Sequence, residues 1–128
     1  MEEKKEETFF ITTAIFYVSD IPHIGHAYEV IAADILSRYW KRRGRDVFFL
    51  TGTDEHGQKI AQAAQMAGLS PRQLVDNFVN DFKKLWEVYH IHYDHFIRTT
   101  DDYHIKGVQE WIERLTLQGD IYKGTYTG

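Results

Sequence analysis

A nearly uninterrupted apolar segment at residues 9–18 places the strongest constraint on the fold of this chain. It consists mainly of aromatic and β-branched residues, and Thr12 and Thr13 are its polar interruptions. A strand with one face in water alternates apolar and polar residues, whereas a strand covered on both faces is apolar along its length. The segment therefore predicts a strand buried on both faces, which is typical of a parallel sheet.

After Pro22 the pattern changes from that of a strand to that of a helix. Apolar residues now recur every three or four positions, which predicts a helix that Gly44 ends. The expected buried face of this helix consists of Ile24, Ala27, Ile31, Ile35 and Tyr39. A second apolar strand follows at residues 47–50, and a polar loop at residues 51–57 connects it to another helix, which ends near Gly68.

Two further helices and one strand complete the predicted elements. Residues 70–73 have the composition of a capping box and begin a helix. The expected buried face of that helix consists of Leu74, Phe78, Phe82, Leu85 and Tyr89. Residues 95–98 predict a third strand, and Thr99 or Thr100 caps a last helix, which Gly119 ends. The expected face of the last helix consists of Ile105, Val108, Ile112 and Leu115.

The order of these elements predicts an α/β fold with a parallel sheet and right-handed crossovers, because strands and helices alternate. Residues 121–128 alternate weakly and suit a further strand. The 128 residues are expected to form one domain, since a domain usually holds roughly 100–200 residues. Residues 1–7 mix acidic and basic side chains, and we expect them to form a flexible, solvated tail.

The composition excludes several classes of protein. The chain has 0 cysteines, so it has neither a disulfide framework nor a thiolate metal site. Its net charge of −4 argues against a polycationic nucleic-acid binder. No segment is as long and apolar as a membrane span, and the mixed N-terminal charges do not fit a signal peptide. We therefore expect a cytoplasmic protein without membrane contact.

Three histidines, His90, His92 and His95, lie close to Asp94 in the sequence and invite comparison with a metal site. Their spacing crosses the predicted junction between a helix and a strand, so the side chains need not converge on one point. We interpret them as a surface cluster and expect no metal site in this chain.

Polar residues follow the first strand and enter the first helix as Pro22-His23-Ile24-Gly25-His26. Ligands of open α/β sheets bind at the carboxyl ends of strands, and a helix N-terminus favours phosphate through its free N–H groups. His23 and His26 project from one side of the first turn and can donate hydrogen bonds to phosphoryl oxygens. Gly25 leaves room for a base or ribose beside the backbone. The alternative is that these histidines only cap the helix.

The loop at residues 51–57 follows the second strand, at the same edge of a parallel sheet. It lacks the Gly-Lys-Ser/Thr of a Walker phosphate loop. Its useful groups are the imidazole of His56 and the carboxylate of Asp54, which can hold a substrate ammonium group. Asp54 can instead serve as the N-cap of the next helix.

Together these residues resemble the methionyl-tRNA synthetases, a family of class I aminoacyl-tRNA synthetases. The resemblance covers nearly the whole chain, and Thr51-Gly52-Thr53-Asp54-Glu55-His56-Gly57 is its most specific part. The matching segments are residues 13–18, 22–28, 33–34, 48–58, 96–100 and 119–122.

The resemblance implies a Rossmann-like, HUP-type parallel sheet with flanking helices. Residues 8–128 would be the N-terminal half of the catalytic domain, ending before the connective insertion. The implied reaction is activation of L-methionine by ATP, supplied as its magnesium complex, to methionyl-adenylate, with later transfer to tRNA(Met). His23, Gly25 and His26 match ATP-binding positions, and the two histidines match catalytic ones. The residues at matching methionine-binding positions are Ala14, Ile15, Tyr17, Asp54 and His56.

Three parts of the family pattern do not occur in this sequence: the Lys-Met-Ser-Lys-Ser motif, the zinc-binding cysteines and the anticodon-binding domain. We therefore expect no zinc site, and a second hypothesis is an ATP- or methionine-binding module with negligible turnover. A third hypothesis is a nucleotidylyltransferase that uses the histidine motif on another acceptor, although Asp54 argues against it. A half-domain would also expose an apolar face, through which we expect self-association.

Overall fold

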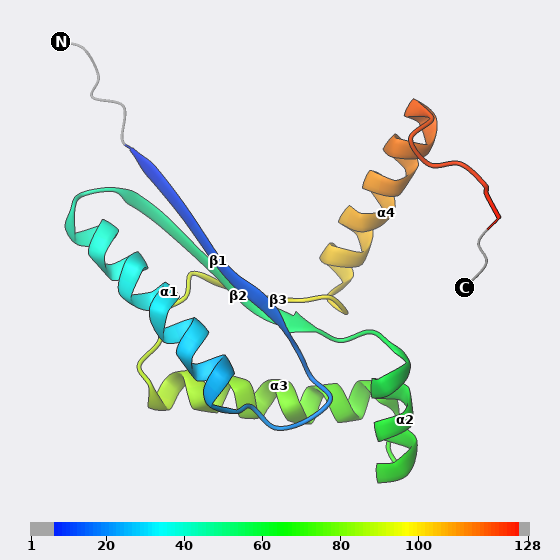
Figure 1. The fold of residues 1–128 in the computed structure, drawn as a ribbon, viewed down its shortest axis with the longest axis horizontal. Helices are drawn as coiled ribbons and strands as arrows, with labels where there is room; N and C mark the ends of the chain where they lie inside the picture. The colour runs from blue at the N-terminus through cyan, green and yellow to red at the C-terminus, as the bar shows by residue number, and fades with distance from the viewer. Residues whose placement is uncertain (1–6, 126–128) are drawn as a thin grey trace.

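The computed structural model describes residues 7–125, which form a three-stranded parallel sheet flanked by helices (Figure 1). The elements are β1 (Thr8–Tyr17), α1 (Ile24–Arg42), β2 (Asp46–Asp54), α2 (Gln58–Ala67), α3 (Pro71–Val88), β3 (His95–Arg98) and α4 (Asp102–Gln118). The strand order is β1-β2-β3, and both neighbouring pairs are parallel. The predicted α/β class, the element order and the parallel sheet are confirmed. The prediction that the first strand is buried on both faces was wrong, since one face of β1 is exposed, with Phe10 62% exposed.

β2 is longer than its apolar segment predicts. Residues 51–54, predicted as a loop, continue the strand and pair with its neighbours. Thr51 and Thr53 are polar but buried, because their hydroxyls have partners. The Thr51 hydroxyl lies 2.8 Å from that of Thr13, and the Thr53 hydroxyl donates to the Glu55 carboxylate at 2.7 Å. Hydrogen bonding of this kind removes the cost of burying a polar side chain in a strand.

α1 packs on the sheet through small residues rather than through its largest apolar ones. Its buried residues are Ala27, Val30, Ala33, Asp34 and Ser37. Of the predicted face, Ala27 is buried and Ile31 partly buried, whereas Ile24, Ile35 and Tyr39 are exposed. The helical period is confirmed, and the predicted buried face was right at Ala27 and Ile31 but wrong at Ile24, Ile35 and Tyr39.

α3 supplies the aromatic part of the core. All residues of its predicted face are buried or partly buried except Tyr89. Phe82 and Trp86 pack against Phe16 of β1, with ring centroids 5.7 Å and 5.5 Å apart. α1 and α3 therefore cover one face of the sheet, as Figure 1 shows.

The starts of two helices test the capping predictions. Ser70 caps α3 through a complete capping box, as predicted. α4 begins after Asp101, so the predicted caps Thr99 and Thr100 were wrong. Both hydroxyls are already bonded to Glu55: that of Thr99 accepts from the backbone N–H, and that of Thr100 donates to the carboxylate.

α4 rises on the other side of the sheet, away from α1 and α3 (Figure 1). It has no buried residue, and its predicted apolar face is exposed apart from Leu115, which is partly buried. Gly119 ends it in the left-handed conformation, as predicted. Residues 121–125 do not form the predicted strand, and residues 126–128 lie outside the described part of the chain.

Glu7, the last residue of the expected flexible tail, is held against the rest of the chain. Glu7 pairs with Arg45 at 2.7 Å, and its carbonyl accepts from the N–H of Asp46. The rest of the predicted tail, residues 1–6, lies outside the described residues. No helix within residues 7–125 is long and apolar enough to cross a membrane.

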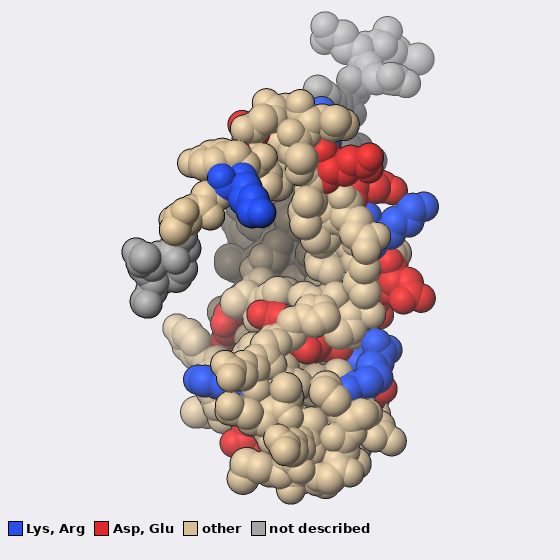
Figure 2. Space-filling view, turned by 90° about the vertical axis from the view of Figure 1, so that its right-hand side faces the viewer, with Lys and Arg blue, Asp and Glu red and all other residues tan. Residues whose placement is uncertain are grey.

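The surface around α4 is dominated by uncharged residues. Figure 2 shows acidic and basic side chains in separate small groups on a face that is otherwise uncharged. Trp111, 61% exposed, and Leu117, 83% exposed, lie on α4. Self-association through such a face stays a prediction.

Candidate functional site

The parallel register brings the two predicted polar clusters to one edge of the sheet. Tyr17, the last residue of β1, lies opposite Asp54, the last residue of β2. From this edge the chain runs from β1 to His23, the N-cap of α1. The edge therefore combines a helix N-terminus with a carboxylate from the neighbouring strand.

His23 and His26 both cap α1, and both do so with Nδ1. The Nδ1 atom of His23 accepts from the N–H of Gly25, and that of His26 accepts from the N–H of His23, each at 3.1 Å. The rings stack with centroids 3.8 Å apart. Since Nδ1 acts as an acceptor in each neutral ring, the ring proton is on Nε2. Both histidines therefore cap the helix, as the alternative interpretation proposed. Because capping uses only Nδ1, the Nε2–H of each ring can still donate to a ligand.

His26 is adapted to act as a neutral donor. Its ring packs edge-on against Phe16 and Phe82, each with a centroid distance of 5.1 Å. This burial and the neighbouring His23 lower the pKa of His26, and the carboxylate of Glu29 opposes them in part. The lowered pKa favours the neutral form of the ring, in which Nε2 carries the proton.

Acid is expected to weaken the start of α1. Because the folded-state pKa of His26 lies below 6.5, its contribution to the free energy of unfolding is complete above about pH 6.5 and is lost as the pH falls through the folded value. Protonated Nδ1 cannot accept the N–H of His23. In urea denaturation, the loss of stability on acidification should be smaller in His26→Gln, whose amide oxygen accepts without titrating. An equal loss in both chains would contradict this assignment.

The His23 ring packs closely over Gly25. A Cβ at residue 25 would lie 3.0 Å from Cε1 and 3.1 Å from Nδ1 of that ring. Part of the room that we expected for a base or ribose is therefore occupied by His23.

Asp54 is the last residue of β2, and His56 lies two residues further along the chain. Asp54 is partly buried, and its carboxylate accepts from the N–H of His56 at 3.4 Å. The N-cap of α2 is Gly57, which makes no side-chain cap, so the alternative reading of Asp54 as that N-cap was wrong. The His56 ring contacts the carbonyl oxygen of Thr99 at 3.3 Å. The Asp54 carboxylate thus remains available to a cationic group.

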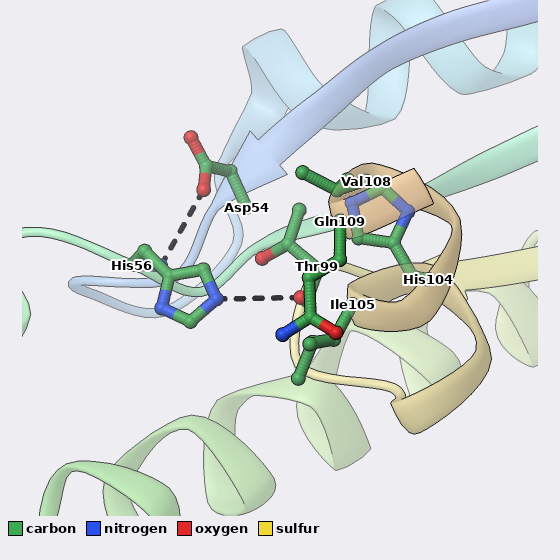
Figure 3. Close-up of a pocket in the computed structure, with 7 residues that line it drawn as sticks. All are labelled: Asp54, His56, Thr99, His104, Ile105, Val108 and Gln109. Carbon is green, nitrogen blue, oxygen red and sulfur yellow. Dashed lines mark hydrogen bonds between the residues drawn. The ribbon is translucent and has the colours of Figure 1, made fainter. Parts of the chain in front are cut away.

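A cavity of about 410 Å³ opens beside Asp54, between the sheet edge and α4 (Figure 3). Its lining residues are Asp54, His56, Thr99, His104, Ile105, Val108 and Gln109. The predicted methionine-binding residues Ala14, Ile15 and Tyr17 do not line it. The Tyr17 hydroxyl instead lies against Gly57, the residue after His56, too close to leave room for a Cβ there.

Sequence reasoning missed the buried ion pair beneath this edge. The Glu55 side chain is 0% exposed, and Arg98 donates to both of its oxygens at 2.6 Å and 2.8 Å. Burial alone would raise the pKa of Glu55, but hydrogen bonds from Arg98, Thr100 and Thr53 keep it below its usual value. Asp76 adds a second contact to Arg98 at 2.5 Å. A detectable signal was present, since Glu55 directly follows the apolar strand β2 and Arg98 ends β3, and a charge that is buried there needs a partner.

The side chains of His92, His95 and Asp94 engage different partners, and at His90 it is the backbone carbonyl that accepts a hydrogen bond, from Arg38. His92 contacts Arg38, His95 contacts the hydroxyl of Tyr103, and Asp94 pairs with Lys41. Within residues 7–125 no group of three or more histidine, aspartate or glutamate side chains is placed to hold a metal ion.

Comparison with known proteins decides the family. The model of the family described as "tRNA synthetases class I (M)" matches residues 9–128. The chain belongs to this family. Methionine–tRNA ligase of Thermotoga maritima is 55% identical over 120 residues, which are 94% of this chain and 19% of that protein. The Clostridium tetani enzyme is 54% identical over 123 residues, 96% of this chain and 19% of its own length.

Solved structures of this synthetase family have the same fold. Mycobacterium tuberculosis methionyl-tRNA synthetase in complex with methionyl-adenylate superimposes with a TM-score of 0.92 at 44% identity. The superposition covers 95% of this chain and 24% of that one. The chain thus spans about a fifth of the length of the curated synthetases that it matches.

Proposed function

We propose that this chain contributes to a site that activates L-methionine with ATP, giving methionyl-adenylate and pyrophosphate. The observation that carries the proposal is the shared sheet edge, where Asp54 lies opposite the end of β1 and the histidine pair begins α1. The family membership and the adenylate bound to the Mycobacterium tuberculosis synthetase support it.

The histidine pair would act on the phosphate. In the reaction the methionine carboxylate attacks the α-phosphate of ATP, and negative charge grows on the phosphoryl oxygens. Nε2–H of His23 and of His26, held by the Nδ1 contacts, would donate to those oxygens. The N-terminus of α1 would add its partial positive charge.

Asp54 would hold the methionine ammonium group, as a carboxylate at the same edge. Ala14, Ile15, Tyr17 and His56 would line the space around the amino acid. We further propose tRNA(Met) as the acceptor and the cytoplasm as the location. ATP would bring magnesium with it, and no residue of this chain is assigned to that ion.

Methionine-dependent exchange between ATP and pyrophosphate tests this function. We expect exchange that falls by roughly 100-fold or more in the variant carrying His23→Ala and His26→Ala, since one lost charge-stabilising donor costs about that much. Lys59→Ala, an exposed change on α2, is the matched control and should leave exchange unchanged. Binding of ATP and methionine without exchange would favour the alternative of a binding module. Exchange that persists in the double variant would refute the assigned role of the histidines.

A further inference from the structure

β1 contains a bulge where it passes the candidate site. Its register against β2 shifts between Thr12 and Ile15. The two residues inside the shift, Thr13 and Ala14, stand against the single residue Thr51, which is the arrangement of a β-bulge. Such bulges redirect side chains and occur preferentially beside active sites.

The bulge changes which residues of β1 face the core. Before the bulge the partly buried residues are the odd-numbered Phe9 and Ile11, whereas Phe16 is buried after it, so the inward-facing residues pass from odd to even positions. Ala14 and Ile15 are both exposed as a result, and Ile15 is 44% exposed. These are two of the residues assigned above to the methionine side of the site.

Glu29 on α1 holds this bulge from outside the sheet. Its Oε1 accepts a hydrogen bond from the N–H of Ala14 at 2.5 Å, across 15 residues of sequence. A bulge leaves one backbone group without a partner in the ladder, and here the carboxylate supplies that partner. The hydrogen bond is charge-assisted and is therefore stronger than one between neutral groups.

We infer that Glu29 is a positioning residue, which fixes the β1 bulge so that Ala14 and Ile15 present their exposed surface to the amino acid. The effect on methionine binding rests on the proposed function, whereas the hydrogen bond between Glu29 and Ala14 does not. Glu29 also lies one helical turn after His26 on α1. The same side chain thus ties the strand on the methionine side to the helix that begins at the ATP side.

Two variants separate the contact from a general loss of stability. Glu29→Ala removes the acceptor, whereas Glu29→Gln keeps an oxygen that can accept from Ala14. Hydrogen exchange of the Ala14 amide, followed by NMR, reads the contact directly. Calorimetric titration with L-methionine and, separately, with ATP reads its effect on each half of the site. Glu113→Ala, an exposed change on α4, is the matched control.

We expect Glu29→Ala to speed Ala14 exchange about tenfold and to weaken methionine binding about tenfold, with ATP binding changed much less. Glu29→Gln should restore most of both. Unchanged Ala14 exchange in Glu29→Ala would overturn the inference. The inference would also be overturned if Glu29→Gln protected the Ala14 amide but bound methionine as weakly as Glu29→Ala. The charge of Glu29 would then act on the ligand directly and not through the bulge. If the unmodified chain binds no methionine, the proposed function and the positioning role both fail, while Ala14 exchange still decides whether Glu29 holds the bulge.

Discussion

Arg98→Met is expected to lower the free energy of unfolding by about 3–5 kcal/mol, because it leaves the Glu55 carboxylate buried without a counter-charge. Glu55 is fully buried and Arg98 is 15% exposed, so water screens this pair weakly. Urea denaturation followed by tryptophan fluorescence measures the loss. The chain with both Arg98→Met and Glu55→Gln should recover most of it, since the neutral amide needs no counter-ion.

Arg72→Met is the matched control for this prediction. Arg72 pairs with Asp76 in an i,i+4 contact and is 55% exposed, so its removal should cost less than about 1 kcal/mol. The pH dependence gives a second check. Because the pKa of Glu55 is lowered in the folded chain, the stability from its ion pair is present above its usual pKa and is lost as the pH falls through the folded value. An Arg98→Met chain as stable as Arg72→Met at neutral pH would contradict the account.

Gly52→Ala is expected to separate β2 from β3. Gly52 is opposite Ile97, and a Cβ on residue 52 would overlap the Ile97 carbonyl oxygen and collide with its side chain. Overpacking usually lowers the free energy of unfolding by about 1–3 kcal/mol. We expect a larger loss here, because the clash is with the Ile97 backbone, which cannot rotate away as a side chain can. In NMR spectra, the amide of Thr99, which donates to the Thr53 carbonyl, should lose its protection from exchange.

The same substitution in α4 serves as its control. A Cβ on Gly107 meets nothing within 4 Å, and Gly107→Ala should stabilise the chain by roughly 0.5–1 kcal/mol, because alanine favours a helix over glycine. If Gly52→Ala is tolerated as well as Gly107→Ala, the close approach of β2 and β3 is wrong.

Much of the fold follows from local sequence patterns. The apolar run that becomes β1, the helical period after Pro22 and the capping box at Ser70 each predicted an element that the structure contains. These signals are local, since they depend on neighbours along the chain.

The errors arise where contacts between distant residues decide the outcome. Thr51 and Thr53 look like loop residues until their hydroxyls find partners in a buried strand. Thr99 resembles a helix cap, but its hydroxyl bonds Glu55 across 44 residues. The bulge at Thr13 and Ala14 has no sequence signature of its own, and the residue that bonds its backbone, Glu29, lies 15 residues further along the chain.

The residues of the candidate site were predicted from the sequence, but the contacts that hold them in place were not. His23, His26 and Asp54 could be selected because polar groups at the carboxyl ends of parallel strands meet at one edge. The sequence could not show that Nδ1 of each ring accepts a backbone N–H and leaves Nε2 for a ligand, because this depends on which backbone amides each ring contacts.

The central claim is that one ligand engages the histidine pair and Asp54 together. Calorimetric titration of the chain with the stable adenylate mimic methionyl sulfamoyl adenosine tests it most directly. The affinity should fall roughly 10–100-fold in the chain with His23→Ala and His26→Ala, and by a similar factor in Asp54→Asn, as expected when hydrogen bonds involving a charged group are lost. Unchanged affinity in either variant would show that the ligand does not bridge the two groups, and the proposed site would be wrong.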